Sequence, residues 1–153
     1  MTTWLSKTAA GDEPLDTVYG LLPDTYQRYQ QLVAHIWQPG LIDPVVLELC
    51  RLRVAQLVRC QRELEIRTPQ ATAAGLDDDK VAKLAQWPTA TEFTEPERAA
   101  LGFAEMYVID PGSVTDAMCE SVTEQFTPPE VAVLTTAVAV FDATARFEVA
   151  LSV

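Results

Sequence analysis

The residues best suited to do chemistry lie close together, in a stretch from residue 48 to residue 67 that holds carboxylates, a thiol and arginines. If residues 60–74 form a helix, Cys60, Glu63 and Arg67 share one face at positions i, i+3 and i+7. Glu63 and Arg67 are then an i,i+4 ion pair. An exposed pair of this kind contributes only about 0.3–0.5 kcal/mol and is common on helix surfaces, so an ordinary solvated face remains the alternative.

A second carboxylate precedes this group on the preceding predicted helix. On that helix, Glu48, Arg51 and Arg59 lie near one face by the 3.6-residue period. A hairpin of the two helices would bring Glu48 towards Cys60 and Glu63.

The segment from Glu48 to Cys60 reads ELCRLRVAQLVRC and resembles the signature of the carboxymuconolactone decarboxylase / alkylhydroperoxidase D superfamily. In the thiol branch of that superfamily the pattern is Glu, eleven residues, Cys, two residues, Cys, three residues and His. Here Glu48 and Cys60 keep the separation, Glu63 stands at the second cysteine position, and Arg67 stands at the histidine position. The likeness extends over about residues 19–152 and includes HIWQPGLIDP (35–44), EPERAALGFAEMYVIDP (95–111) and FDATARF (141–147).

The departures from this signature weigh against the dithiol reaction. That reaction needs a second thiol to resolve the sulfenic acid to a disulfide, which Glu63 cannot do. Arg67 cannot shuttle a proton near neutral pH. Cys50 lies ten residues before Cys60, which is about 15 Å along a helix and beyond disulfide reach. Two-cysteine peroxidase chemistry is therefore not expected.

The decarboxylase branch of the superfamily gives a second comparison. Its corresponding stretch resembles GELKLH, and residues 62–67 of this chain read RELEIR. Glu63 aligns, but Arg67 again replaces the histidine, which argues against the decarboxylase reaction itself. A carboxylate beside an arginine remains, and this pair is suited to binding an anionic or lactone-like molecule, or to general-base catalysis by Glu63.

The resemblance therefore implies a divergent family protein, of the kind described as peroxidase-like (peroxiredoxin activity, an oxidoreductase) but without a dithiol centre. We expect it to act on or bind a small organic molecule near Glu63 and Arg67, with Glu48 and Cys60 completing the site. A single-cysteine peroxidase that uses Cys60 and an external thiol stays open. The alternative is a non-catalytic scaffold or binding domain that has lost the ancestral reaction, so whether the chain is an enzyme is left open.

The elements that must position these residues are helices. Hydrophobic residues recur at helical spacing and no stretch alternates with period two, so the sequence predicts an all-α single domain of about six to seven helices over residues 23–153. The resemblance implies that these helices form an orthogonal bundle like that of alkylhydroperoxidase D. Residues 1–22 are predicted to be an irregular arm. The helix signals include an Asp43-Pro44 start and capping boxes at Thr94 and Thr127. The predicted helices are 23–37, 44–58, 60–74 with Pro69 inside, 77–86, 95–108, 114–126, and 128 nearly to the end.

The last predicted helix is apolar on most sides, which indicates that it is buried, either as a central core helix or against another subunit. The resembled superfamily often forms trimers or larger rings, so a homo-oligomer is expected. Asp142 and Arg146 form an i,i+4 pair on this helix, interpreted as a structural ion pair in preference to a pocket lining.

Composition narrows the possible partners and cofactors. The net charge is −11, which disfavours nucleic acid and anionic membranes. The three cysteines are odd in number and irregularly spaced, which is typical of a reducing, cytoplasmic setting. His35 is the only histidine, and no nucleotide-binding motif occurs, so no metal and no cofactor is expected.

Overall fold

The computed structural model describes residues 14–152 of the 153-residue chain. Within that range all regular structure is helical and no residue lies in a β-strand, which confirms the predicted all-α fold. The elements in chain order are α1 (Pro14–Tyr19), α2 (Pro23–Ile36), α3 (Pro44–Val58), α4 (Gln61–Glu65), α5 (Pro69–Ala73), α6 (Asp78–Ala82), the 3-10 turn η1 (Leu84–Gln86), α7 (Glu95–Ile109), the 3-10 turn η2 (Pro111–Ser113), α8 (Asp116–Gln125) and α9 (Pro128–Leu151).

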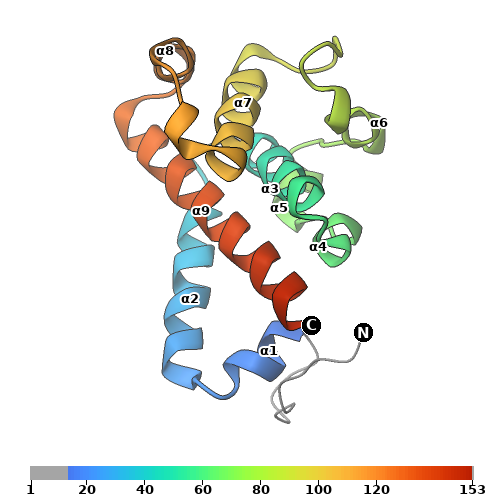
Figure 1. The fold of residues 1–153 in the computed structure, drawn as a ribbon, viewed down its shortest axis with the longest axis vertical. Helices are drawn as coiled ribbons and strands as arrows, with labels where there is room; N and C mark the ends of the chain where they lie inside the picture. The colour runs from blue at the N-terminus through green and yellow to red at the C-terminus, as the bar shows by residue number, and fades with distance from the viewer. Residues whose placement is uncertain (1–13, 153) are drawn as a thin grey trace.

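Helices α3, α7 and α9 form the centre of the bundle (Figure 1). Helix α3 packs on both of the others and carries side chains that are buried on several sides, among them Leu47, Leu49 and Leu52. Helix α8 covers α7 at one end of the molecule. Because α3 lies at the centre, the polar side chains that it buries must find their partners inside the protein.

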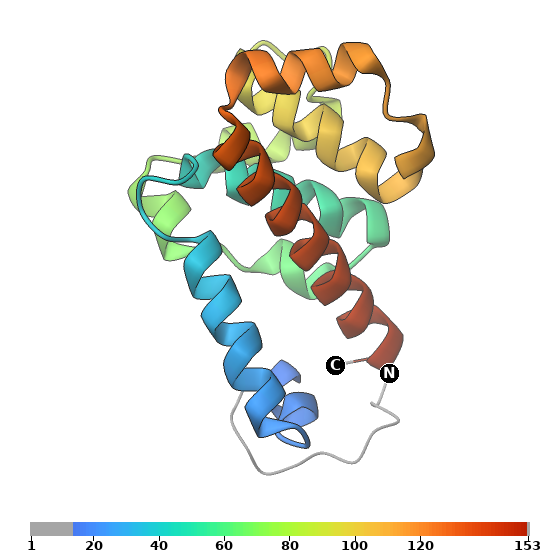
Figure 2. The ribbon, with the colours of Figure 1, turned by 90° about the vertical axis from the view of Figure 1, so that its left-hand side faces the viewer.

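Helices α2 and α9 pack together, and α1 closes the end of the molecule beside them (Figure 2). The ring of Tyr19 in α1 stacks on Phe147 in α9, with ring centroids 5.3 Å apart. The predicted irregular arm, residues 1–22, is therefore wrong for Pro14–Tyr19, which is helical. The rest of that prediction, for residues 1–13, lies outside the described residues.

The predicted helix starts are confirmed. The Asp43 side chain accepts a hydrogen bond from the Val45 N–H and caps α3. Reciprocal capping boxes join Thr94 to Glu97 at the start of α7 and Thr127 to Glu130 at the start of α9. Side-chain oxygens thus satisfy backbone donors that helix ends leave open.

The predicted helix 60–74 is broken in two, and this changes the site. Pro69 has no N–H to donate and disfavours helical geometry at the residue before it. Thr68 is accordingly extended, α4 ends at Glu65 and α5 begins at Pro69. The predicted helix 77–86 likewise divides into α6 and η1. Two of the predicted helices are therefore each replaced by two shorter elements.

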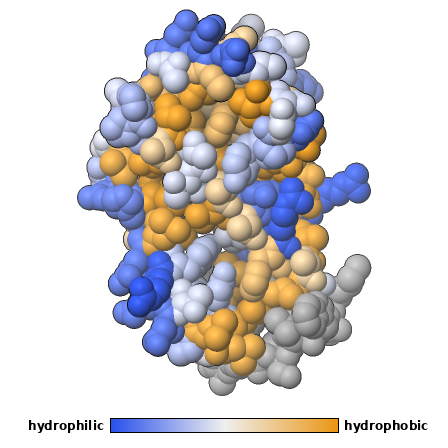
Figure 3. Space-filling view, turned by 60° about the vertical axis from the view of Figure 1, so that its left-hand side comes forward, coloured by the Kyte–Doolittle hydropathy of each residue, from blue (hydrophilic) through white to orange (hydrophobic). Residues whose placement is uncertain are grey.

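Helix α9 buries one side in the core and leaves part of its surface open. Leu134, Val138, Phe141 and Ala145 are buried, whereas Val149 is about half exposed. Apolar side chains surround a hollow on the face that α2 and α9 share (Figure 3). None of the described helices is both long enough and apolar enough to cross a membrane.

Candidate functional site

The centre of the site is an ion pair inside α3. Glu48 and Arg51 are three residues apart and so point to the same side of the helix. Arg51 Nε and Nη2 donate to the two oxygens of Glu48, at 2.9 and 2.7 Å. Glu48 is fully buried and Arg51 is 5% exposed. A bidentate pair of this kind fixes both side chains in one geometry.

Helix α4 supplies the remaining partners of Arg51. The Nη1 atom of Arg51 donates to the carboxylate Oε2 of Glu63 at 2.5 Å and to the backbone carbonyl of Glu63 at 2.8 Å. Its Nη2 also donates to the Ile66 carbonyl at 2.9 Å. A guanidinium has five N–H groups, and these five acceptors use all of them. Burial by itself lowers the pKa of Arg51, but its hydrogen bonds and charge contacts with Glu48 and Glu63 raise it overall.

The break before α5 completes the coordination of Glu48. Because Thr68 is extended, its backbone N–H and its hydroxyl both face Glu48, and they donate to the two carboxylate oxygens at 3.1 and 3.0 Å. The buried carboxylate therefore accepts four hydrogen bonds. Glu63 differs: its Oε2 accepts from Arg51, whereas its Oε1 accepts from no residue in the described part of the chain.

A cavity of about 180 Å³ lies against this network, between α2, α9 and the α3–α5 segment. Its walls are mainly apolar, and Glu63 and Arg51 are the charged residues that line it. The lining residues are Leu15, Tyr29, Val33, Ile36, Trp37, Arg51, Glu63, Ile66, Thr68, Val140, Phe141 and Thr144. A mostly apolar cavity with a few converging polar groups is the usual form of a small-molecule site.

Two residues with hydroxyl groups also line the cavity. The oxygens of Tyr29 in α2 and Thr144 in α9 are 2.7 Å apart, and either hydroxyl can be the donor. Burial raises the pKa of Tyr29, the Thr144 hydrogen bond opposes this, and the charges of Tyr19, Glu63 and Glu148 add to the rise. The Tyr29 phenol is therefore neutral near pH 7 and serves as a hydrogen-bond group.

Cys60 lies outside this cavity and has a different partner. Its thiol donates to Oε2 of Glu148 in α9 at 3.2 Å, and the side chain is buried. Burial raises the pKa of Cys60 to about 11; the backbone of Glu63 lowers it, and the hydrogen bond and charge of Glu148 raise it. Burial and the Glu148 carboxylate thus disfavour a thiolate at Cys60 near neutral pH.

The four predicted site residues divide into three groups in the structure. Glu48 and Glu63 both accept hydrogen bonds from Arg51, which joins them. Among the described residues, no hydrogen bond joins Glu48 to Cys60, whose thiol donates to Glu148. Arg67 lies after the end of α4, is exposed, and donates to the backbone carbonyls of Leu64 and Ile66. The predicted Glu63–Arg67 pair is therefore wrong, because Glu63 pairs with Arg51 and the helix ends before residue 67.

Sequence reasoning did not identify four residues that the structure places at these sites: Arg51 as the central cation, Tyr29, Thr144 and Glu148. The spacing of Arg51 three residues after Glu48 was an available signal, because this spacing favours a pair within one helix. No local signal links Tyr29 to Thr144 or Cys60 to Glu148, which are 115 and 88 residues apart.

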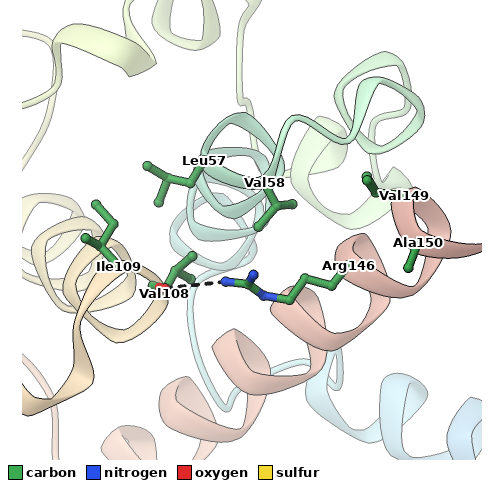
Figure 4. Close-up of a pocket in the computed structure, with 7 residues that line it drawn as sticks. All are labelled: Leu57, Val58, Val108, Ile109, Arg146, Val149 and Ala150. Carbon is green, nitrogen blue, oxygen red and sulfur yellow. Dashed lines mark hydrogen bonds between the residues drawn. The ribbon is translucent and has the colours of Figure 1, made fainter.

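A second depression lies on the surface between α3, α7 and the end of α9 (Figure 4). Arg146 is the one polar side chain among its seven lining residues. That guanidinium donates to the Asp142 carboxylate at 2.7 Å and reaches the Val108 carbonyl, so the ion pair forms, but at the surface, whereas a structural role required the pair to be buried. Exposed Ile109 and Val149 make this groove apolar without offering groups for chemistry.

Over the described residues, no three or more histidine, cysteine or acidic side chains gather as a metal site would require.

Comparisons with known proteins agree with this architecture. The family model described as "Carboxymuconolactone decarboxylase family" matches residues 23–106. The uncharacterized protein YnjA of Escherichia coli K12 is 29% identical over 112 residues, which are 73% of this chain and 62% of YnjA. The chain thus spans less than two thirds of the length of that relative.

Two solved structures share the fold. One is a protein of unknown function from Agrobacterium tumefaciens, described as a candidate antioxidant defence protein AhpD. It aligns with a TM-score of 0.76 and 20% sequence identity, over 88% of this chain and 92% of that protein. The other is the alkylhydroperoxidase AhpD core of an uncharacterized peroxidase-related protein from Ralstonia eutropha JMP134, with a TM-score of 0.72, 15% identity, and coverage of 90% and 74%. At these identities the likeness shows the fold alone.

Proposed function

This chain belongs to the carboxymuconolactone decarboxylase family, and we propose that it binds a small organic molecule in the cavity beside Glu63 and presents the Glu63 carboxylate to it. The observation that carries this proposal is the geometry of Glu63. Arg51 holds one carboxylate oxygen, while the other accepts no hydrogen bond from the described residues. A carboxylate held in place at the wall of an apolar cavity is suited to accept a hydrogen bond or a proton from a ligand.

The size of the cavity limits the ligand. A dry cavity of about 150 Å³ holds one benzene molecule, and this cavity has about 180 Å³. We therefore propose a ligand of about one ring. Arg67 has no part in the site, because it is exposed and bonded to backbone carbonyls.

Binding is tested with one-ring fragments by ligand-observed NMR and by thermal shift. Val33 in α2 lines the cavity. The larger side chain of Val33→Phe should fill part of the cavity volume and so weaken ligand binding at least about tenfold. Leu32→Phe is the matched control, because Leu32 is exposed on the same helix. Equal loss of binding in both variants, or no fragment binding to the wild type, contradicts the proposal.

A catalytic role for Glu63 is tested separately from binding. If Glu63 is a general base, the protein should speed the exchange of an acidic C–H of a bound cyclic ketone with deuterated water, and Glu63→Gln should abolish this effect. Glu65→Gln is the control, because Glu65 is exposed in the same short helix. Binding without exchange in the wild type supports the non-catalytic alternative, in which the fold is kept as a binding domain.

Peroxide reduction at Cys60 is the second candidate, and one observation favours it: the Glu148 carboxylate is within hydrogen-bond distance of the thiol and is placed to accept its proton. The buried thiol with a pKa of about 11 opposes it. In such a cycle the Cys60 thiolate would reduce the peroxide and become a sulfenic acid, which two equivalents of an external thiol would return to the thiol. Peroxide consumption with a small-thiol reductant that is unchanged in Cys60→Ser excludes this reaction.

The expected homo-oligomer and the cytoplasmic setting stay proposals. Exposed Ile109 and Val149 on neighbouring helices are compatible with a covered apolar surface. Sedimentation velocity of the purified chain measures the oligomeric state directly.

A further inference from the structure

The guanidinium nearest to the cavity has no hydrogen bond left to offer a ligand. All five N–H groups of Arg51 are used, by both oxygens of Glu48, by the carboxylate and carbonyl of Glu63, and by the Ile66 carbonyl. A ligand carboxylate would have to displace a protein acceptor from Arg51, which is only 5% exposed. Binding of an anion through Arg51 would therefore break a bond that the fold already makes.

The charges around the cavity also disfavour an anion. Glu48 and Glu63 provide two carboxylates against the single guanidinium of Arg51, so this group of three carries one net negative charge. Glu148 is a further buried carboxylate outside the cavity lining, and its ion pair with Arg62, at 4.0 Å, balances its charge. Burial raises the pKa of Glu148, and the charge of Glu63 raises it further, as expected where two carboxylates repel each other.

The neutral polar groups of the cavity select for a different kind of ligand. Within the Tyr29–Thr144 pair one hydroxyl donates to the other, so the second hydroxyl proton is available whichever one donates. Glu63 Oε1 is the complementary feature, an acceptor without a donor among the described residues. A ligand with one hydroxyl or amino group can donate to Glu63, and a hydroxyl oxygen can also accept from the hydroxyl pair.

We infer that the cavity takes a neutral or cationic molecule of about one ring that carries a hydrogen-bond donor, and that it rejects carboxylates of the same size. This inference rests on the proposed function, since it concerns the ligand of the same site. It departs from the anionic or lactone-like ligand that the sequence favoured, because that expectation assumed an arginine free to bind an anion. The structure has Arg51 fully engaged and Arg67 outside the cavity.

The test compares four one-ring compounds of similar size on the full chain: benzyl alcohol, benzylamine, toluene and benzoate. Dissociation constants are measured by ligand-observed NMR at pH 7.5 and low salt. Benzyl alcohol and benzylamine are expected to bind best, and toluene about tenfold more weakly because it leaves the Glu63 acceptor unsatisfied. Benzoate is expected to bind on the order of 100-fold more weakly than benzyl alcohol, because its carboxylate would be repelled by Glu63 at the mostly apolar wall of the cavity.

A charge variant separates electrostatic selection from shape. Glu63→Gln keeps the size of the side chain and removes its charge, so the preference for benzyl alcohol over benzoate should fall at least about tenfold. Glu65→Gln, two residues away and exposed, should leave the preference unchanged. If Glu63→Gln does not fold, the four-compound series on the wild type still decides the question.

The outcomes distinguish this inference from the proposed function. Benzoate binding as tightly as benzyl alcohol would overturn the inference while leaving a small-molecule site in place. Toluene binding as tightly as benzyl alcohol would overturn the part that requires a donor. Failure of all four compounds to bind would remove the proposed function itself.

Discussion

Removal of the Arg51 guanidinium is the perturbation with the largest expected effect on this fold. In Arg51→Met, Glu48 loses two of its four hydrogen bonds and its counter-charge while it stays fully buried. Glu63 and Ile66 lose their bonds to the same group. Breaking a buried ion pair from one side costs about 3–5 kcal/mol, because the remaining charge has no partner.

The cost translates into a measurable shift in melting temperature. A chain of this length loses about 2–4 °C per kcal/mol, so the melting temperature should fall by about 6–20 °C. The deficit should shrink as the pH is lowered, because an unpaired buried carboxylate takes up a proton more readily in the folded state than in the unfolded chain. Thermal melts followed by circular dichroism between pH 5 and pH 8 measure both effects.

Two further variants make this test specific. Arg146→Met removes an exposed i,i+4 ion pair with Asp142 and should cost no more than about 0.5 kcal/mol. The double variant Glu48→Gln/Arg51→Met removes both charges and should recover a large part of the loss. A fall of less than about 2 °C in Arg51→Met, or a deficit that does not depend on pH, would refute the reasoning.

Three further predictions concern other parts of the molecule. Iodoacetamide at pH 7.5 should alkylate the exposed Cys119 first and Cys60 about 100-fold more slowly, because the pKa of Cys60 is about 11; similar rates in a mass-spectrometric time course would contradict this. Glu148→Gln should raise the free energy of unfolding at pH 7 but not near pH 4, as measured by urea titration. The reason is that burial and then the charge of Glu63 raise the pKa of Glu148 in the folded state, so the wild-type carboxyl destabilises the fold as the pH rises through that pKa. Thr94→Ala should cost about 1 kcal/mol in the same titration, because it removes the cap of α7; an unchanged midpoint would show that the capping box is dispensable.

Helix positions and helix starts could be predicted because their causes are local. Asp43 and Thr94 cap the helices that follow them, and a side-chain oxygen placed before the first turn is visible in the sequence. The family resemblance around Glu48 also came from a contiguous run of residues. The predicted helix 60–74 had Pro69 inside it, and the complete break at this proline, with its effect on Arg67, was not predicted.

The partners of each charged side chain depend on how the helices pack. Glu63 pairs with Arg51 on another helix, although Arg67 is four residues after it, the spacing that favours an ion pair within a helix. Arg51 is buried, so each hydrogen bond that it loses costs more than a hydrogen bond lost at the surface. Cys60 meets Glu148 only because α9 folds back beside the start of α4.

The sequence alone therefore determined the helical class, the helix starts and the loss of a second thiol, all of which depend on residue types and short spacings. The tertiary structure alone decided that Arg51 is saturated, that Cys60 is a buried thiol, and that a small cavity opens beside Glu63. These features depend on which distant side chains exclude water from one another, and burial sets the strength of every charge and hydrogen bond among them.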